Sequence, residues 1–131
     1  MANGNFLLTD PRVYPNIRAA AILTTQYVAA TVIEAFQKNQ LIIDLFFTKG
    51  SLTSLDVKVE TSWNNIDYTQ ITGGSLSMGV TTTSLGTYNM TATGNYQIAL
   101  PIMTRYIKIS AQGNGTVTSS SLQINAAVGV S

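Results

Sequence analysis

The residues best placed to do chemistry are two carboxylates, Asp56 and Glu60, which lie four positions apart with Lys58 between them. A general acid and base need carboxyl groups about 5–10 Å apart in a cleft, with environments that separate their pKa values. In an extended strand, four residues span roughly 13 Å and all three side chains point to the same face. The spacing therefore indicates a charge-balanced, solvent-facing surface and not a catalytic pair.

Other catalytic chemistry finds little support in the composition. Histidine and cysteine are both absent from the 131 residues, which removes the commonest general base, thiol nucleophiles, thiolate metal ligands and every Ser-His or Cys-His arrangement. The aspartates are too dispersed for a calcium loop, and Gly73-Gly74 lacks the lysine and helix start of a phosphate loop. We expect no enzymatic activity, no catalytic residue, no metal and no cofactor.

Asp44 is the one acidic residue that interrupts a strongly apolar run, residues 41–48. A buried carboxylate needs a hydrogen-bonding or charged partner. We expect Asp44 either to pair across strands with Lys58, Arg105 or Lys108, or to occupy an edge position.

Three aromatic residues, Trp63, Tyr68 and Tyr88, are close in sequence to a long polar segment, residues 72–87. Aromatic rings beside such a segment could stack on sugars, so a glycan- or host-surface-binding module is one hypothesis. The competing expectation is that Trp63, the only tryptophan, packs in or at the rim of the core. The formal net charge is +1, with basic residues scattered singly, so nucleic acid is not an expected partner.

The elements that would position these residues are β-strands. The chain is 45% hydrophobic but only 10% charged, against roughly 25% charged in typical soluble domains, and Thr, Ser, Asn and Gly make up the difference. Residues 55–63 alternate between apolar and polar, which predicts a half-buried strand. We predict that this strand and the buried strand at residues 41–48 form a hairpin around residues 49–51, and that residues 112–115 form another turn.

The N-terminal third is less regular. Residues 19–36 predict two strands with a bend near Thr25 and Gln26, with one amphipathic helix as the alternative. Residues 1–18 contain Pro11 and Pro15, which argue against a helix or a central strand. We expect these residues to be either a flexible tail or an extended arm that docks on another subunit. The docking side chains would be the apolar residues of the arm, namely Phe6, Leu7, Leu8, Val13, Tyr14 and Ile17.

Together these elements predict an all-β protein. We expect an antiparallel β-sandwich of about eight strands, jelly-roll-like or Greek-key, with the arm at residues 1–18 and a single sandwich domain at residues 19–131. The longest apolar runs are too short to span a bilayer, and the first residues do not resemble a secretory signal. We therefore expect synthesis in a cytoplasm and no membrane partner.

Two segments, FTKGSLTSLDVKVETSW (residues 47–63) and YQIALPIMTRYIKISAQGNGTVTSSSLQINAAVG (residues 96–129), resemble small β-sandwich structural proteins of tailed bacteriophages. The resemblance covers about residues 41–129, and its motifs are structural. It implies a virion protein, either a capsid decoration (cement) protein or a head-tail or tail accessory protein, made in the host cytoplasm. The implied partners are the major capsid protein or other virion proteins, and further copies of the chain in a homo-oligomer. A looser similarity of residues 105–109 to galactose-binding-like sandwiches carries no ligand residues.

Overall fold

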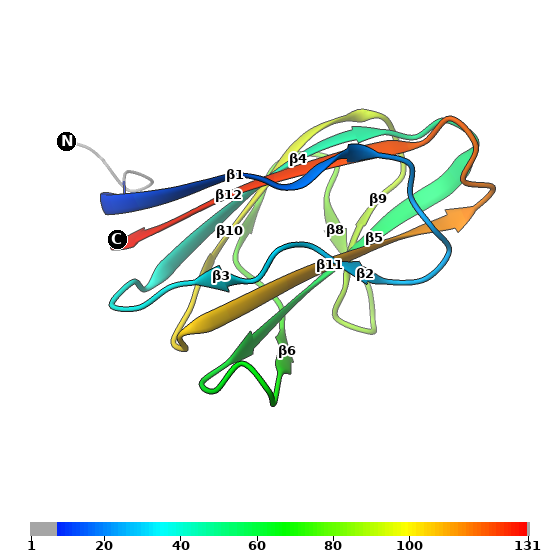
Figure 1. Ribbon diagram of the computed structural model, residues 1–131. Helices are drawn as coiled ribbons and strands as arrows, with labels where there is room; N and C mark the ends of the chain where they lie inside the picture. Colours follow the sequence, from blue (N-terminus) through cyan, green and yellow to red (C-terminus); the bar gives the residue numbers. More distant parts are fainter. Residues whose placement is uncertain (1–7, 131) are drawn as a thin grey trace.

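The computed structural model describes residues 8–130, and that part of the chain contains β-strands and no helix (Figure 1). Two antiparallel sheets pack face to face. Sheet A has the strand order β1 (Thr9–Ala21), β12 (Ser121–Val130), β4 (Gln40–Thr48), β10 (Gly94–Pro101) and β7 (Ser75–Leu76). Sheet B has the order β2 (Val28–Ala29), β11 (Tyr106–Gly115), β5 (Leu52–Ser62), β9 (Tyr88–Met90) and β8 (Thr81–Thr82), with β3 (Ile33–Glu34) beside β11 and β6 (Thr69–Ile71) beside β5.

This architecture confirms the predicted antiparallel β-sandwich. Six strands have eight or more residues, and the other six described strands have two or three residues each. The short strands all lie in the irregular segments, at residues 22–39 and 64–93, which is why the sequence indicated about eight strands. No helix long and apolar enough to cross a membrane occurs among residues 8–130.

The core lies between the two sheets and is built by strand alternation. In β4, and in β5 from Leu55 to Thr61, every second residue is buried, because successive side chains of a strand point to opposite faces. The same period buries Tyr96, Ile98 and Leu100 of β10, and Ile107 and Ile109 of β11. The alternation predicted from sequence for residues 55–63 is thus confirmed within β5, where Leu55, Val57 and Val59 face the core.

The predicted hairpin between β4 and β5 is wrong, because the two strands lie in different sheets. β4 pairs with β10 and β12, whereas β5 pairs with β11, β6 and β9. The turn between them crosses from one sheet to the other and packs on a second such crossing: Gly50 has φ +56°, and an added Cβ there would lie 2.5 Å from the backbone of Ser119. Apolar alternation occurs in both strands because each faces the core from its own sheet, so the pattern cannot distinguish a crossing from a hairpin.

The turn predicted at residues 112–115 is also wrong, since these residues are the end of β11. The chain turns after them, at residues 116–120, and again changes sheet. Gly113 is needed for packing: an added Cβ would lie 2.7 Å from Leu52 Cδ2 and 3.3 Å from Leu23 Cβ. Asn114 is also part of β11, and its side-chain amide donates a hydrogen bond to Ser54 Oγ of β5 at 2.9 Å.

Strand β1 runs across the expected boundary at residue 18 and pairs along β12 of the same chain. Figure 1 shows these two strands side by side over their whole length. β1 is an edge strand, the position in a sheet that tolerates Pro11 and Pro15. Asp10 and Asn16, both with φ +51°, coincide with its register shifts. Residues 9–18 of the predicted arm therefore form part of sheet A.

The segments between the long strands behave largely as their composition indicates. Residues 22–39 bend at Thr25 and Gln26 and contribute only β2 and β3, so the helical alternative is wrong. Residues 72–87 are an irregular excursion that places β7 on sheet A and β8 on sheet B. This excursion forms one wall of a groove on the outer face of sheet A.

Candidate functional site

Trp63 lies immediately after β5 and is 72% exposed, which corrects the expectation that it packs in or at the rim of the core. The strand ends at Ser62, whose hydroxyl oxygen accepts hydrogen bonds from the backbone N–H groups of Asn64 at 3.2 Å and Asn65 at 3.0 Å. Asn65 itself has φ +60°. This tight turn takes Trp63 out of the alternation that buries the residues before it.

Trp63 is part of a partly apolar depression of about 230 Å³ at one end of the sandwich. Three chain segments meet there: the turn between β3 and β4, the end of β5, and the connection from β10 to β11. Figure 1 shows β3, the start of β11 and the end of β5 at the same end of the molecule. We call this the end surface; its lining residues are Ala35, Phe36, Gln37, Lys38, Trp63, Met103, Thr104 and Arg105.

Three large apolar side chains of the end surface face solvent. Phe36 is 56% exposed, Trp63 72% and Met103 86%. Folded monomers seldom leave several large apolar side chains together in water, and such groups commonly mark an interaction surface. Phe36 and Met103 were not predicted as site residues, because no spacing rule joins three residues that lie in separate connections.

The charged residues of the end surface are paired within the chain. Arg105 Nη2 lies 3.2 Å from Glu34 Oε2, and its guanidinium lies 5.0 Å from the centre of the Phe36 ring. Lys38 Nζ lies 2.6 Å from Asp10 Oδ2. The hydrogen bond from Lys38 and its positive charge lower the pKa of Asp10. The end surface therefore offers apolar contact between ion pairs and carries little net charge.

The structure does not bring Tyr68 and Tyr88 to Trp63 as a shared ligand site. Tyr88 is fully buried in the core, where its hydroxyl donates to the carbonyl oxygen of Gly73 at 3.0 Å and burial raises its pKa. Tyr68 is half-buried under Lys108, whose Nζ lies 4.2 Å from the ring centre. The predicted ligand role of Tyr88 is therefore wrong, since no ligand reaches a core side chain.

Most of the described arm residues contact their own chain. Ile17 is a core residue, and the half-buried Tyr14 donates its hydroxyl hydrogen to the backbone oxygen of Glu34 at 2.9 Å. Leu8 lies against Gly129, where an added Cβ would come within 2.7 Å of the Leu8 Cβ. Val13 remains 65% exposed. The other two predicted arm contacts, Phe6 and Leu7, lie outside the described residues.

The charged side chains on the outer face of β5 interact with neighbouring side chains. The spacing of Asp56, Lys58 and Glu60 predicts such a charge-balanced face. Lys58 Nζ lies 3.9 Å from Glu60 Oε1 and 4.5 Å from the centre of the Tyr27 ring. The Asp56 carboxylate accepts hydrogen bonds from the amides of Asn89 and Asn114, both at 2.8 Å. No group of three or more acidic side chains able to hold a metal ion is found within residues 8–130.

The predicted ion pair between Asp44 and Lys58, Arg105 or Lys108 is wrong, and so is the predicted edge position. The three candidate cations all lie on or next to sheet B, whereas Asp44 is in β4, in the middle of sheet A. Its cross-strand neighbours are Gln97 of β10 and Asn125 of β12. Asp44 Oδ1 is buried and accepts no hydrogen bond from the described residues. Like the exposed apolar side chains of the end surface, this unpaired carboxylate oxygen is not explained by the packing of the two sheets.

No protein-family model matches the chain. No curated protein matches it either. Among solved structures, the fold is similar to the crystal structure of the SPBc2 prophage-derived protein YomS, with a TM-score of 0.52. The two sequences are 17% identical, and the match covers 95% of this chain and 98% of that one. At this identity the similarity shows a common fold over the whole of both chains.

Proposed function

We propose that the chain is a structural protein of a phage virion, and specifically a capsid decoration (cement) protein that binds the major capsid lattice and stabilises it. Two independent similarities support a phage origin: the sequence resemblance to phage sandwich proteins, and the shared fold with a prophage-derived protein of nearly the same extent. The role as an attached structural component is argued from the surface of the molecule.

The observation that carries the proposal is the end surface. Trp63, Phe36 and Met103 are exposed together, and Arg105 lies beside them. Aromatic residues, Met and Arg are the residue types enriched in protein–protein interfaces. A large ring in a fully desolvated pocket of the partner is also the usual form of a binding hot spot.

A lattice amplifies a contact of this size. Repeated sites on a capsid allow many copies to attach, and in a homo-oligomer two or more end surfaces would engage at once, which raises the avidity without new contacts. A protein that binds the assembled shell and not its free subunits stabilises the shell by mass action. Bridging neighbouring capsid subunits would therefore make the particle harder to disrupt.

Quantitative mass spectrometry of purified particles, from the phage or lysogen that encodes the chain, tests the role. A decoration protein is expected in a fixed ratio to the major capsid protein. A small, constant number per particle would indicate the head-tail or tail accessory role instead. Complete absence from particles would refute a virion protein of either kind.

The attachment surface is tested with particles that lack the chain. Purified protein carrying Trp63→Ala and Met103→Ala should no longer co-sediment with them. The matched control, Met78→Ala with Leu85→Ala, also removes two exposed apolar side chains, at 95% and 83% exposure, but from the excursion at residues 72–87. Undiminished co-sedimentation of the first variant would show that attachment uses another surface.

A further inference from the structure

The outer face of sheet A carries a groove that the proposed attachment does not use. Two adjoining depressions, of about 190 Å³ and 320 Å³, share the side chains of Ser77 and Gln97. We call them together the sheet A groove; the residues that matter for its chemistry are Ile42, Asp44, Phe46, Asn95, Gln97 and Ala99. The floor is formed by β4 and β10, and one wall by the segment around β7.

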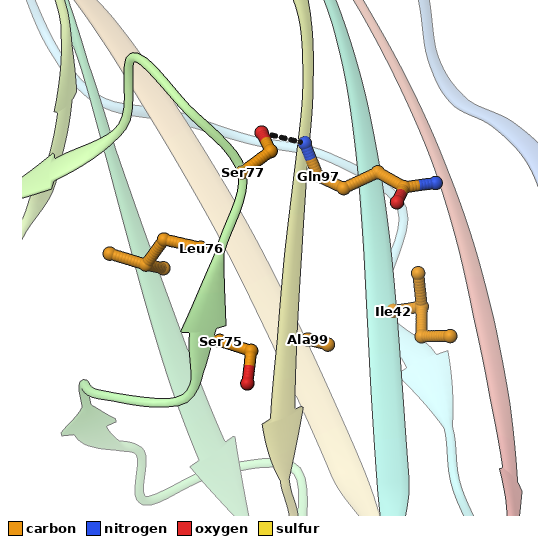
Figure 2. A pocket seen from close by; sticks show the side chains of 6 residues that line it. All are labelled: Ile42, Ser75, Leu76, Ser77, Gln97 and Ala99. Atoms are coloured by element: carbon orange, nitrogen blue, oxygen red, sulfur yellow. Dashed lines mark hydrogen bonds between the residues drawn. The ribbon is translucent and has the colours of Figure 1, made fainter. Parts of the chain in front are cut away.

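The wall is fixed to the floor by backbone and side-chain hydrogen bonds. Ser77 Oγ accepts a hydrogen bond from the backbone N–H of Gln97 at 2.9 Å (Figure 2). The Ser77 N–H donates to the Gln97 carbonyl at 3.0 Å. These bonds extend the pairing of β7 with Ile98 and Ala99 of β10. Figure 2 shows the Gln97 side chain extending from β10 across β4, away from the wall. The groove is therefore a pre-formed feature of the sheet.

Its polar groups are left without partners by the rest of the described chain. Asp44 Oδ1 is buried and accepts no hydrogen bond, and Asp44 lies directly opposite Gln97 in the β4–β10 register. No hydrogen bond joins the side-chain amides of Gln97 or Asn95 to another described residue. A buried polar atom without a partner costs free energy, so native structures seldom contain one that has no structural or functional reason.

Apolar groups lie beside these polar ones. Phe46 is two residues from Asp44 on the same strand, so both side chains point to the same face, and Phe46 is 37% exposed. Ile42 and Ala99 continue the apolar part of the groove on the other side of Gln97. One carboxylate, two primary amides and an exposed aromatic ring thus share a single sheet face.

We propose that the sheet A groove binds a saccharide, with Asp44 and Gln97 bonded to its hydroxyl groups and Phe46 against its C–H face. Each sugar hydroxyl is both a donor and an acceptor; the carboxylate accepts, and the amides do both. The apolar face of a pyranose ring suits an aromatic neighbour. The ammonium group of a lysine side chain could pair with the single negative charge but has no acceptor for the amide N–H groups, so the donor and acceptor set favours the polyhydroxylated ligand.

This inference does not rest on the virion role, and its test is separate. The ¹⁵N-labelled full chain is titrated with the methyl glycosides of glucose, galactose, mannose and N-acetylglucosamine, and amide chemical shifts are followed by NMR. At least one sugar is expected to shift resonances of β4, β7 and β10. Parallel sedimentation with purified bacterial cell-wall polysaccharide shows whether the same site takes a surface-bound glycan or only the free sugar.

Two variants locate the site. Asp44→Asn keeps the shape of the side chain but removes the charged acceptor, and Gln97→Ala removes an exposed amide from the groove. A hydrogen bond to a charged group contributes more binding free energy than one to a neutral group. Asp44→Asn should therefore weaken sugar binding on the order of tenfold or more. Glu60→Gln, which neutralises one carboxylate on the outer face of the opposite sheet, is the matched control and should leave sugar binding unchanged.

Several results would overturn the proposal. Shifts with none of the four sugars would exclude a saccharide site, and shifts confined to the neighbourhood of Trp63 would place binding at the end surface. Equal weakening by Glu60→Gln would show an effect of overall charge. Shifts of the groove resonances with a lysine-rich peptide and with no sugar would assign the groove to a cationic partner.

Discussion

Replacing Gly113 with alanine should destabilise the fold through one defined clash. Gly113 lies in β11 opposite Leu55, and its N–H donates to the carbonyl of Thr24 at 2.7 Å. An added Cβ would lie 2.7 Å from Leu52 Cδ2 and 3.3 Å from Leu23 Cβ. Since Gly113 does not have a positive φ, an alanine can adopt its backbone conformation, and the cost arises from the lack of space.

The expected size follows from two opposing effects. Alanine restricts the unfolded chain more than glycine does, which favours folding by about 0.4–1 kcal/mol. Forcing a methyl group into a packed interior costs about 1–3 kcal/mol. Leu52 can yield partly because the contact is at the end of its side chain, whereas Leu23 is met at its Cβ. We expect Gly113→Ala to lower the free energy of unfolding by about 1–2 kcal/mol.

Urea unfolding of four proteins isolates the clash: the parent chain, Gly113→Ala, Leu52→Ala and the double variant. Leu52→Ala alone should cost about 2–5 kcal/mol, since the side chain is almost fully buried. In the double variant the new methyl group occupies part of the space that Leu52 leaves, so the combined cost should fall below the sum by about 1 kcal/mol. The slope of the unfolding free energy against urea concentration should stay the same in all four.

Gly94→Ala is the control, because Gly94 also lies in a strand without a positive φ, and its added Cβ would come no closer than 3.2 Å to Tyr96. Its cost should be clearly smaller than that of Gly113→Ala. A neutral or stabilising Gly113→Ala, or costs for Gly113→Ala and Leu52→Ala that simply add, would refute the packing explanation for this glycine.

Three further predictions concern single side chains. Tyr88→Phe removes the hydroxyl that donates to the Gly73 carbonyl in the core and should lower the unfolding free energy by about 1 kcal/mol in urea titrations; an unchanged midpoint would contradict this. Lys38 lowers the pKa of Asp10 in the folded protein. Their ion pair therefore stabilises the fold at pH values above the pKa of Asp10 in the unfolded chain, and this stabilisation is lost as the pH falls through the pKa of Asp10 in the folded protein. Asp10→Asn should therefore show a shallower acid-side loss of stability below about pH 4 in urea midpoints measured against pH, and an identical profile would exclude the contribution. Trp63, at 72% exposure, should emit nearly as in the unfolded chain and should be readily quenched by acrylamide; a strongly blue-shifted native emission would place it in an apolar environment.

Much of the local structure could be predicted from the sequence. The buried face of β5, with Leu55, Val57 and Val59 inward, follows from period-2 alternation, as do the inward residues of β10 and β11. The direction of a side chain in a strand depends only on its position in that strand. The bend at Thr25 and Gln26 was likewise predictable from local composition.

Strand pairing was not predictable in the same way. Both crossings between the sheets, at residues 49–51 and 116–120, have the largely polar composition that is also typical of hairpin turns. Whether such a turn returns the chain to the same sheet or sends it to the opposite one depends on contacts with distant residues, here between Gly50 and Ser119. Gly113 was mistaken for a turn residue for the same reason, since the Leu52 side chain it accommodates lies 61 positions away.

The two candidate surfaces, like the strand pairing, depend on contacts between distant parts of the chain. By itself, the sequence determined that the chain is a β-sandwich without histidine or thiol chemistry, because composition and alternation are local properties. Only the tertiary structure decided that Tyr88 is a core residue, that Trp63 meets Phe36 and Met103 at one end, and that Asp44 faces Gln97 without a cation. These groupings join residues from separate strands and connections, and the packing of two sheets, which no short segment encodes, brings them together.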